Sequence, residues 1–263
     1  MPTYDGSGSS IHPSVVDFGG LWHGYRWWFA DTPYANENDQ LENPSIFASN
    51  HRAVWEVPAG LINPVAPPPV GGFNSDVDLV WDPDGERLVC FWRDYVSTRT
   101  PPMLIRMKWS TDGVTWNETS DPIQLSASPW ASPVVSRAGA GDWRLWFFGN
   151  NSPGTMWTAT DPLGPWAFAS TLDMGGRTNW HGDIIKHQGQ WLGVVSDKSI
   201  GYAMASTNDG VTWNLGTSLF TSYRPTFCPS TEPGMFDIWT SVMRTQVYYH
   251  RLPESTWLDL LAP

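Results

Sequence analysis

Five short runs of strand-forming residues in this 263-residue chain each begin with a polar side chain. These first residues are His12, Asp76, Ser132, His181 and Arg224. Two of the runs carry a carboxylate two positions further on, at Asp78 and Asp183. Because alternate residues of a strand share one face, each of these carboxylates points the same way as the first residue of its run. Two imidazoles, three carboxylates and a guanidinium are groups that bind a small polar ligand.

The runs recur because the chain is built from five divergent repeats of about fifty residues, within the length range of structural repeats. The hexapeptide Asp-Gly-Val-Thr-Trp-Asn occurs at 112–117 and again at 209–214, and a looser version ends at Trp166. Weaker versions end near both ends of the chain. The five repeats then end at Trp55, Trp116, Trp166, Trp213 and Trp257.

Each repeat has the same order of elements. The polar-led run is followed by a turn with glycine, an aromatic strand, a third strand, the tryptophan turn and a fourth strand. The aromatic strands are predicted over Tyr25–Ala30, Arg87–Trp92, Trp143–Phe148, Gln190–Val195 and Met235–Thr240. This pattern predicts an all-β fold, a single five-bladed β-propeller of four-stranded antiparallel blades over residues 1–263, with almost no helix. A two-sheet sandwich is the alternative, but it leaves the repeated tryptophan turn unexplained.

The first strand of each propeller blade lines a central channel, so the five polar first residues are expected to converge there. The predicted ligand-binding residues are His12, Asp76, Asp78, Trp180, His181, Asp183 and Arg224. Trp180 is included because it directly precedes its inner strand, where an aromatic ring can stack on a sugar. The alternative is that these polar groups only hydrogen-bond one another and trapped water in a narrow channel.

No cofactor is expected and no metal site is predicted. A divalent cation held by His12, His181, Asp76 and Asp183 is the alternative, since imidazole and carboxylate suit several metals. The chain has no close-spaced ligand pair of the His-x-His kind to strengthen it. Cys90 and Cys228 are far apart in apolar strands, which favours two buried free thiols.

Charge and composition exclude several classes of partner. The formal net charge is -11 and no run of Lys and Arg forms a basic stripe, so nucleic acid and anionic membranes are poor partners. No stretch approaches eighteen uninterrupted apolar residues, so membrane insertion is not expected. The first ten residues lack the basic and apolar regions of a signal peptide.

Two motifs carry a resemblance to known families. The two Asp-Gly turns resemble the Asp-box of sialidase-type propellers, which is a structural hairpin away from the active centre. One turn consists of Ser110 and 112–116, and the other of Ser206 and 209–213. Parts of the first two repeats resemble five-bladed glycosidase-like propellers of the family 43 and 117 type. These parts are His12-Pro13, Trp27–Ala30 and 42–46 in the first repeat and 74–79 in the second. Among such propellers, the chain looks most similar to minor tail proteins of phages that infect actinobacteria.

The resemblance implies a phage tail protein of the minor tail or receptor-binding type, assembled in the host cytoplasm into the virion tail. Its partners would be a host surface glycan, recognised at the central channel face, and other tail proteins. The first alternative is a glycoside hydrolase of the family 43/117 or sialidase-like type, in which Asp76, Asp183 and Glu42 would be the catalytic carboxyl groups. An architectural tail protein without glycan binding is the second.

Two departures weaken the hydrolase alternative. Family 43 hydrolases place a catalytic aspartate in the first strand of the first blade, where this chain has His12. Sialidases bind the substrate carboxylate with three arginines, and only Arg224 occupies a matching position. The sequence therefore favours a binding protein over an enzyme.

Overall fold

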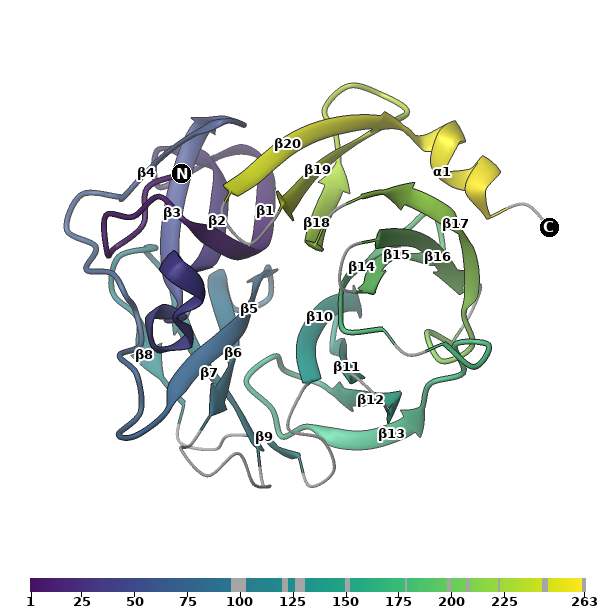
Figure 1. Ribbon diagram of the computed structural model, residues 1–263, viewed down its shortest axis with the longest axis horizontal. Coiled ribbons are helices and arrows are strands. Elements are labelled where there is room, and N and C mark those ends of the chain that lie inside the picture. Colours follow the sequence, from purple (N-terminus) through teal and green to yellow (C-terminus); the bar gives the residue numbers. More distant parts are fainter. Residues whose placement is uncertain are drawn as a thin grey trace. The chain divides into compact units, whose positions relative to one another are not determined.

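The fold is all-β, a five-bladed propeller with four-stranded antiparallel blades, as the repeats predict. In the computed structural model, five antiparallel sheets follow one another along the chain. Each sheet is made of consecutive strands, so its strands have neighbouring colours in Figure 1. The structure describes residues 1–95, 103–119, 123–125, 131–149, 152–177, 179–197, 200–206, 209–221, 223–242 and 246–261.

Internal contacts group the chain into two compact units. The first contains residues 1–129 and 241–249, and the second contains residues 130–240 and 250–263. The single domain over residues 1–263 stays a prediction. Among the described residues, no helix is both long and apolar enough to cross a membrane.

The first unit contains two sheets. The strands of the first sheet are β1 (Ser10–Trp22), β2 (Tyr25–Pro33), β3 (Ser45–His51) and β4 (Val54–Glu56). Two short 3-10 helices, η1 (Ala35–Glu37) and η2 (Asp39–Leu41), connect β2 to β3. The strands of the second sheet are β5 (Phe73–Asp82), β6 (Arg87–Tyr95), β7 (Met103–Ser110), β8 (Asn117–Glu118) and β9 (Ile123–Leu125), of which β8 and β9 both pair with β7.

Two further sheets lie in the second unit. One consists of β10 (Ala131–Gly139), β11 (Asp142–Gly149), β12 (Ser152–Ala159) and β13 (Ala167–Thr171). The other consists of β14 (His181–His187), β15 (Gln190–Asp197), β16 (Ile200–Ser206) and β17 (Asn214–Phe220). The last sheet of the chain has three strands, β18 (Tyr223–Pro229), β19 (Met235–Val242) and β20 (Gln246–Pro253), and is followed by α1 (Glu254–Leu260).

The second strand of each sheet forms the core, as its aromatic composition predicts. All but the first residue of β6 are buried, and the last seven residues of β2 are buried as well. Strands buried on both faces read as continuous apolar runs rather than alternating ones. The outermost strands β13, β17 and β20 instead carry mostly exposed or half-buried residues. Cys90 and Cys228 are buried free thiols, as expected.

The Asp-Gly turns are held by their aspartates. The Asp112 carboxylate accepts the backbone N–H groups of Val114 and Thr115 at 2.8 and 2.7 Å and the hydroxyl of Ser110 at 2.9 Å. Burial raises the pKa of Asp112, but these donors outweigh it and lower the pKa to about 2. Asp209 has the same arrangement, so both turns are structural, as their resemblance to the Asp-box implies.

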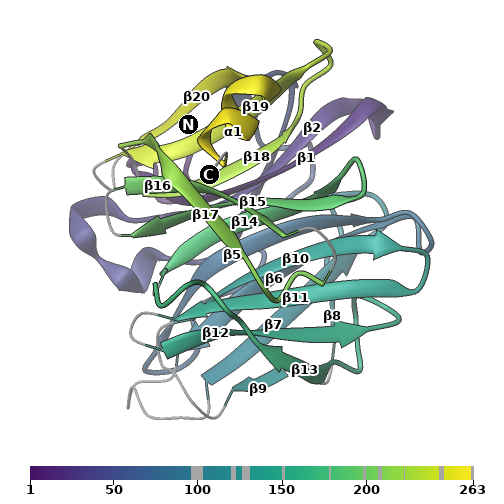
Figure 2. The same ribbon diagram turned by 90° about the vertical axis from the view of Figure 1, so that its right-hand side faces the viewer.

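The end of the chain differs from the prediction. Trp257, expected in a fifth tryptophan turn, lies in α1, which follows β20 in Figure 2. Its fully buried ring stacks on Phe227 at 4.5 Å and meets Phe236 at 5.3 Å between ring centroids. The side chain packs onto the last sheet, but a helix carries it instead of the predicted turn.

Candidate functional site

Two of the predicted site residues, His12 and Asp76, lie in β-bulges. In β1, His12 and Pro13 together stand opposite a single residue of β2, and in β5, Asp76 and Val77 stand opposite a single residue of β6. His12 and Asp76 adopt left-handed backbone conformations, with φ of 59° and 54°. Such strain costs about 1–3 kcal/mol in a residue other than glycine and is concentrated at functional sites. The first two repeats therefore share this local geometry at equivalent positions.

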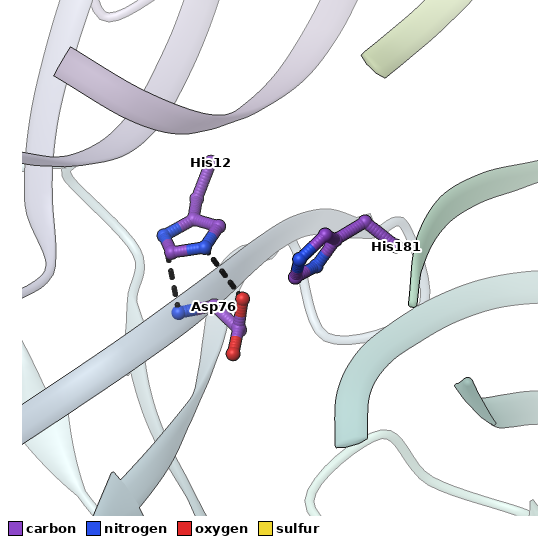
Figure 3. Close-up of side chains that lie close together, drawn as sticks. All are labelled: His12, Asp76 and His181. Carbon is purple, nitrogen blue, oxygen red and sulfur yellow. Dashed lines mark hydrogen bonds and ion pairs between the residues drawn. The ribbon is translucent and has the colours of Figure 1, made fainter. Parts of the chain in front are cut away.

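His12 and Asp76 form the centre of a buried cluster in the first unit (Figure 3). The His12 Nε2 atom lies 2.5 Å from Oδ1 of Asp76. On the other side of the ring, Nδ1 accepts the backbone N–H of Asp76 at 3.4 Å and lies 2.7 Å from the hydroxyl of Thr32. Since a backbone N–H can only donate, Nδ1 is the unprotonated nitrogen and Nε2 carries the proton toward the carboxylate.

Arg93 holds the other oxygen of Asp76. Its Nη2 lies 2.6 Å from Oδ2 of Asp76 and donates to the hydroxyl of Ser75 at 3.0 Å. Arg93, Ser75 and Asp76 are all buried. A buried ion pair of this kind is stable only when further hydrogen bonds satisfy its atoms, and Ser75 supplies one of them.

Glu42 is the second carboxyl group of the cluster. The Ser75 hydroxyl is hydrogen-bonded to Oε2 of Glu42 and lies 3.3 Å from Oδ2 of Asp76. Burial, reinforced by the negative charge of Asp76, raises the pKa of Glu42 well above its ordinary value. This shift favours the uncharged form of Glu42, in which Arg93 has Asp76 as its negative partner.

Asp78 lies on the same strand as Asp76 and faces β1. Its Oδ1 accepts the hydroxyl of Ser14 at 2.8 Å, and the same hydroxyl oxygen accepts the backbone N–H of Leu79 at 2.9 Å. These bonds join the first strands of two consecutive sheets. The Asp78 carboxylate therefore has a structural role, because it connects β5 to β1.

In the second unit, His181 is held between Ser132 and Arg224. Arg224 Nε donates to His181 Nε2 at 2.9 Å, and His181 Nδ1 lies 2.5 Å from the hydroxyl of Ser132. Because Nε2 accepts, Nδ1 carries the proton and donates to Ser132. This tautomer cannot take a proton from the serine, so the pair does not have the geometry of an activated serine nucleophile. His181 is the third side chain drawn in Figure 3.

The other predicted residues of the second unit surround this group. Trp180 is half-buried, and its ring stacks on His181 at 5.2 Å between centroids. Asp183 accepts the hydroxyl of Thr226 at 2.7 Å and the backbone N–H groups of Phe227 and Ile184 at 2.9 and 2.8 Å. Burial nevertheless raises the pKa of Asp183. Arg224 shares the left-handed backbone of His12 and Asp76, with φ of 50°.

Among the described residues of the first unit, the candidate metal ligands that lie together are His12 and Asp76. His12 and Asp76 present a nitrogen and an oxygen of suitable kind, whereas a catalytic zinc site takes three protein ligands. Glu42 is a further carboxyl of this cluster, but burial raises its pKa, which disfavours the ionised form that a ligating carboxylate needs. The absence of a cofactor, and the alternative of a divalent cation, stay predictions.

Sequence reasoning missed the residues that complete the first cluster. Arg93 and Thr32 lie on the second strands, and Ser75 precedes a predicted residue. One pattern could have indicated Arg93: the charged pair Arg93-Asp94 interrupts an otherwise apolar, fully buried strand. A buried charge needs a partner, and the nearest first strand carries Asp76.

Comparisons with known proteins point to carbohydrate-active enzymes. No family model matches the sequence. A segment of 109 residues, 40% of this chain, is 34% identical to the A type blood N-acetyl-alpha-D-galactosamine deacetylase of Flavonifractor plautii, and the match spans only 14% of that protein's length.

Solved structures with the same fold match a larger part of this chain. The N-acetylgalactosamine deacetylase of F. plautii, in complex with blood group B trisaccharide, superposes with a TM-score of 0.78 at 20% identity, covering 99% of this chain and 95% of that one. The alpha-L-arabinanase of Penicillium chrysogenum, complexed with arabinobiose, has a TM-score of 0.61 at 13% identity, covering 98% and 80%. The alpha-L-arabinofuranosidase of Fusarium graminearum has a TM-score of 0.63 at 14% identity, covering 94% and 77%. These likenesses show a glycosidase-like propeller fold.

The expectation of a phage tail protein is wrong. The sequence relative and the structural neighbours are carbohydrate-active enzymes, so the hydrolase alternative fits them better. The expectation rested on short motifs around His12 and Glu42 that describe a blade pattern. Such a pattern is shared by proteins of unrelated function.

Proposed function

We propose that the protein is a carbohydrate-active hydrolase that removes the acetyl group from an N-acetylated amino sugar of a glycan. The observation that carries this proposal is the buried cluster in which an unprotonated histidine nitrogen lies beside a neutral carboxyl group: His12 Nδ1 is 3.8 Å from Oε2 of Glu42. Amide hydrolysis needs a group that takes a proton from water and a group that gives one to the departing amine. His12 and Glu42 have the protonation states for these two roles.

Asp76 orients the histidine in this proposal. It holds Nε2 of His12 and thereby leaves Nδ1 as the acceptor, the arrangement in which a carboxylate positions a catalytic base. Water, deprotonated by His12, adds to the acetyl carbonyl carbon. The carbon–nitrogen bond then breaks, the nitrogen takes the proton of Glu42, and acetate and a free amine are released.

Glycoside hydrolysis is the second candidate, supported by the arabinanase and arabinofuranosidase neighbours and by two carboxyl groups in the cluster. It fits the geometry less well. The two carboxyl groups that hydrolyse a glycoside flank the bond and remain free to act on it. Here both contact the same serine hydroxyl, and Asp76 is also engaged by His12 and Arg93. The 34% identity to a deacetylase further favours the first candidate.

One assay separates the two reactions. The purified protein is incubated with oligosaccharides that end in N-acetylgalactosamine or N-acetylglucosamine, and free acetate, free amine and new reducing ends are measured. Deacetylation releases equal amounts of acetate and amine, and glycoside hydrolysis releases reducing ends alone. Glu42→Gln and Asp76→Asn should each lower the rate at least a hundredfold. Glu118→Gln, an exposed carboxylate on β8, is the matched control and should leave the rate unchanged. Release of neither product from any of these sugars would count against both candidates.

A further inference from the structure

A second hydrogen-bonded chain runs beside the cluster and fixes the backbone on both sides of Glu42. Glu42 lies at the centre of a tight turn in which the Asn43 N–H donates to the carbonyl of Leu41 at 2.7 Å. Its φ of -69° and ψ of 63° are those of an inverse γ-turn. A turn of three residues has little internal stabilisation, so other contacts must hold it.

Tyr4 and Asn43 supply the contacts on the outer side of the turn. The Tyr4 hydroxyl donates to the carbonyl of Leu41 at 3.0 Å and accepts the Asn43 side-chain N–H at 2.8 Å. The same Asn43 amide nitrogen donates to the carbonyl of Gln40 at 3.1 Å. The residues before and after Glu42 are therefore tied to one phenol oxygen.

Asn74 ties the turn to the strand that carries Asp76. Its Nδ2 donates to Oδ1 of Asn43 at 3.0 Å and to the carbonyl of Pro67 at 3.0 Å. Asn74 precedes Ser75, whose hydroxyl contacts Glu42, and both asparagines are buried. The bond between the asparagine side chains thus links the two peptide segments whose carboxyl groups meet at Ser75.

We propose that Tyr4, Asn43 and Asn74 are positioning residues that hold the carboxyl group of Glu42 against Ser75. Polar networks in which each member is bonded fix a single arrangement of buried groups, and a small displacement of a reacting group lowers a rate strongly. The effect on catalysis rests on the proposed function. The placement of Glu42 does not, since it is a property of the folded protein.

The test is Tyr4→Phe, which removes only the hydroxyl. We expect kcat for acetate release to fall about tenfold with KM changed less than twofold. The infrared carboxyl band of Glu42, identified by its loss in Glu42→Gln, should shift and broaden. Asn38→Ala is the matched control. Asn38 caps η2 in the same segment by accepting the Gln40 N–H at 3.1 Å, and it is not part of the hydrogen-bonded network of Tyr4, Asn43 and Asn74. It should lower Tm by a similar amount and leave kcat and the band unchanged.

Asn74→Asp provides an independent second variant. It keeps the shape of the side chain but turns an oxygen toward Oδ1 of Asn43, and it should have a larger effect than Tyr4→Phe on both readouts. An unchanged Glu42 band in Tyr4→Phe overturns the inference, whether or not the wild-type protein is active. A shifted band in a protein that releases no acetate supports the positioning role and contradicts the proposed function alone. Equal losses of kcat in Tyr4→Phe and Asn38→Ala would mean that the segment only needs to be stable.

Discussion

Ser14 donates its hydroxyl to Asp78 at 2.8 Å and so joins β1 to β5. Thr226 donates in the same way to Asp183 at 2.7 Å and joins β18 to β14. All four residues lie two positions after the polar residue that begins each predicted run, so the same contact recurs in both units. The position that the sequence indicated for ligand binding is thus used to connect neighbouring first strands.

Ser14→Ala should therefore destabilise the protein without acting on the proposed reaction. It leaves a buried carboxylate oxygen and the N–H of Leu79 without their partner, which costs about 1–3 kcal/mol each when no water replaces it. The free energy of unfolding in urea measures the loss. Thr226→Val should lose less, because Asp183 keeps the backbone N–H groups of Phe227 and Ile184. Ser7→Ala, at an exposed serine, is the control. A variant of Ser14 as stable as the wild type would show that this contact contributes nothing.

The two carboxyl groups of the first cluster should respond oppositely to the same chemical change. The raised pKa of Glu42 favours its uncharged form, which an amide resembles, so Glu42→Gln should leave stability at pH 7 within about 1 kcal/mol or raise it. Asp76→Asn instead removes the carboxylate that Arg93 and His12 contact, and breaking a buried ion pair costs about 3–5 kcal/mol. Denaturant unfolding of both variants at pH 7 measures the difference. Equal losses would mean that both groups are ionised in the folded protein.

The sequence located the first strands, because a polar residue before a β-branched run is visible in each repeat. Only His181 begins its strand, whereas His12, Asp76, Ser132 and Arg224 lie one to three residues inside theirs. The contacts between His12 and Asp76, and between Ser132, His181 and Arg224, follow from that equivalence. The bulges were not predicted, since a positive φ at histidine or aspartate leaves no mark in the sequence. Neither were the partners from second strands and loops, because their approach depends on strand register and loop path.

The last repeat shows the same limit. A tryptophan at the expected spacing predicted a turn at Trp257, whereas the chain forms α1 there. Trp257 and Leu261 have the four-residue spacing of a helix face, and Pro253 precedes the helix as its N-cap. The regular spacing of the repeat tryptophans predicts a turn, and the helical spacing and the proline predict a helix. The indoles of Trp55, Trp213 and Trp257 are all buried, so a helix can place the ring in the core where other repeats use a strand or a turn.

Gly113 should not tolerate a side chain. Its φ is +75°, and a Cβ atom there would lie 2.0 Å from the ring of the buried Trp28. Gly113→Ala combines a disfavoured backbone with overpacking, and we expect a loss of about 2–4 kcal/mol in the free energy of unfolding. Gly139→Ala is the matched control, since a Cβ there meets no atom within 4 Å and the φ is not positive. Similar losses in both variants would contradict a specific contact with Trp28.

Asp31 should make the protein less stable as the pH rises from about 4 to 8. Burial raises its pKa from 3.8 to about 8, although the hydroxyl of Ser10 donates to it. Over this range the unfolded chain has lost the proton that the folded protein keeps, so unfolding becomes more favourable by up to about 1.4 kcal/mol per pH unit. Asp31→Asn removes this dependence, because an amide is neutral in both states.

The measurement is the difference in Tm between Asp31→Asn and the wild type at pH 4, 5.5, 7 and 8. Among the described residues, Oδ1 of Asp31 is buried without a hydrogen-bond partner, so an amide nitrogen in its place carries a cost that does not change with pH. The Tm difference should therefore move in favour of the variant by several degrees between pH 4 and pH 8. Other titrating groups, including Glu42, contribute equally to both proteins and cancel in the difference. Asp84→Asn, at an exposed carboxylate, should follow the wild type at every pH. If the Asp31→Asn and wild-type curves run parallel instead, Asp31 is ionised in the folded protein and must have a partner that balances its charge.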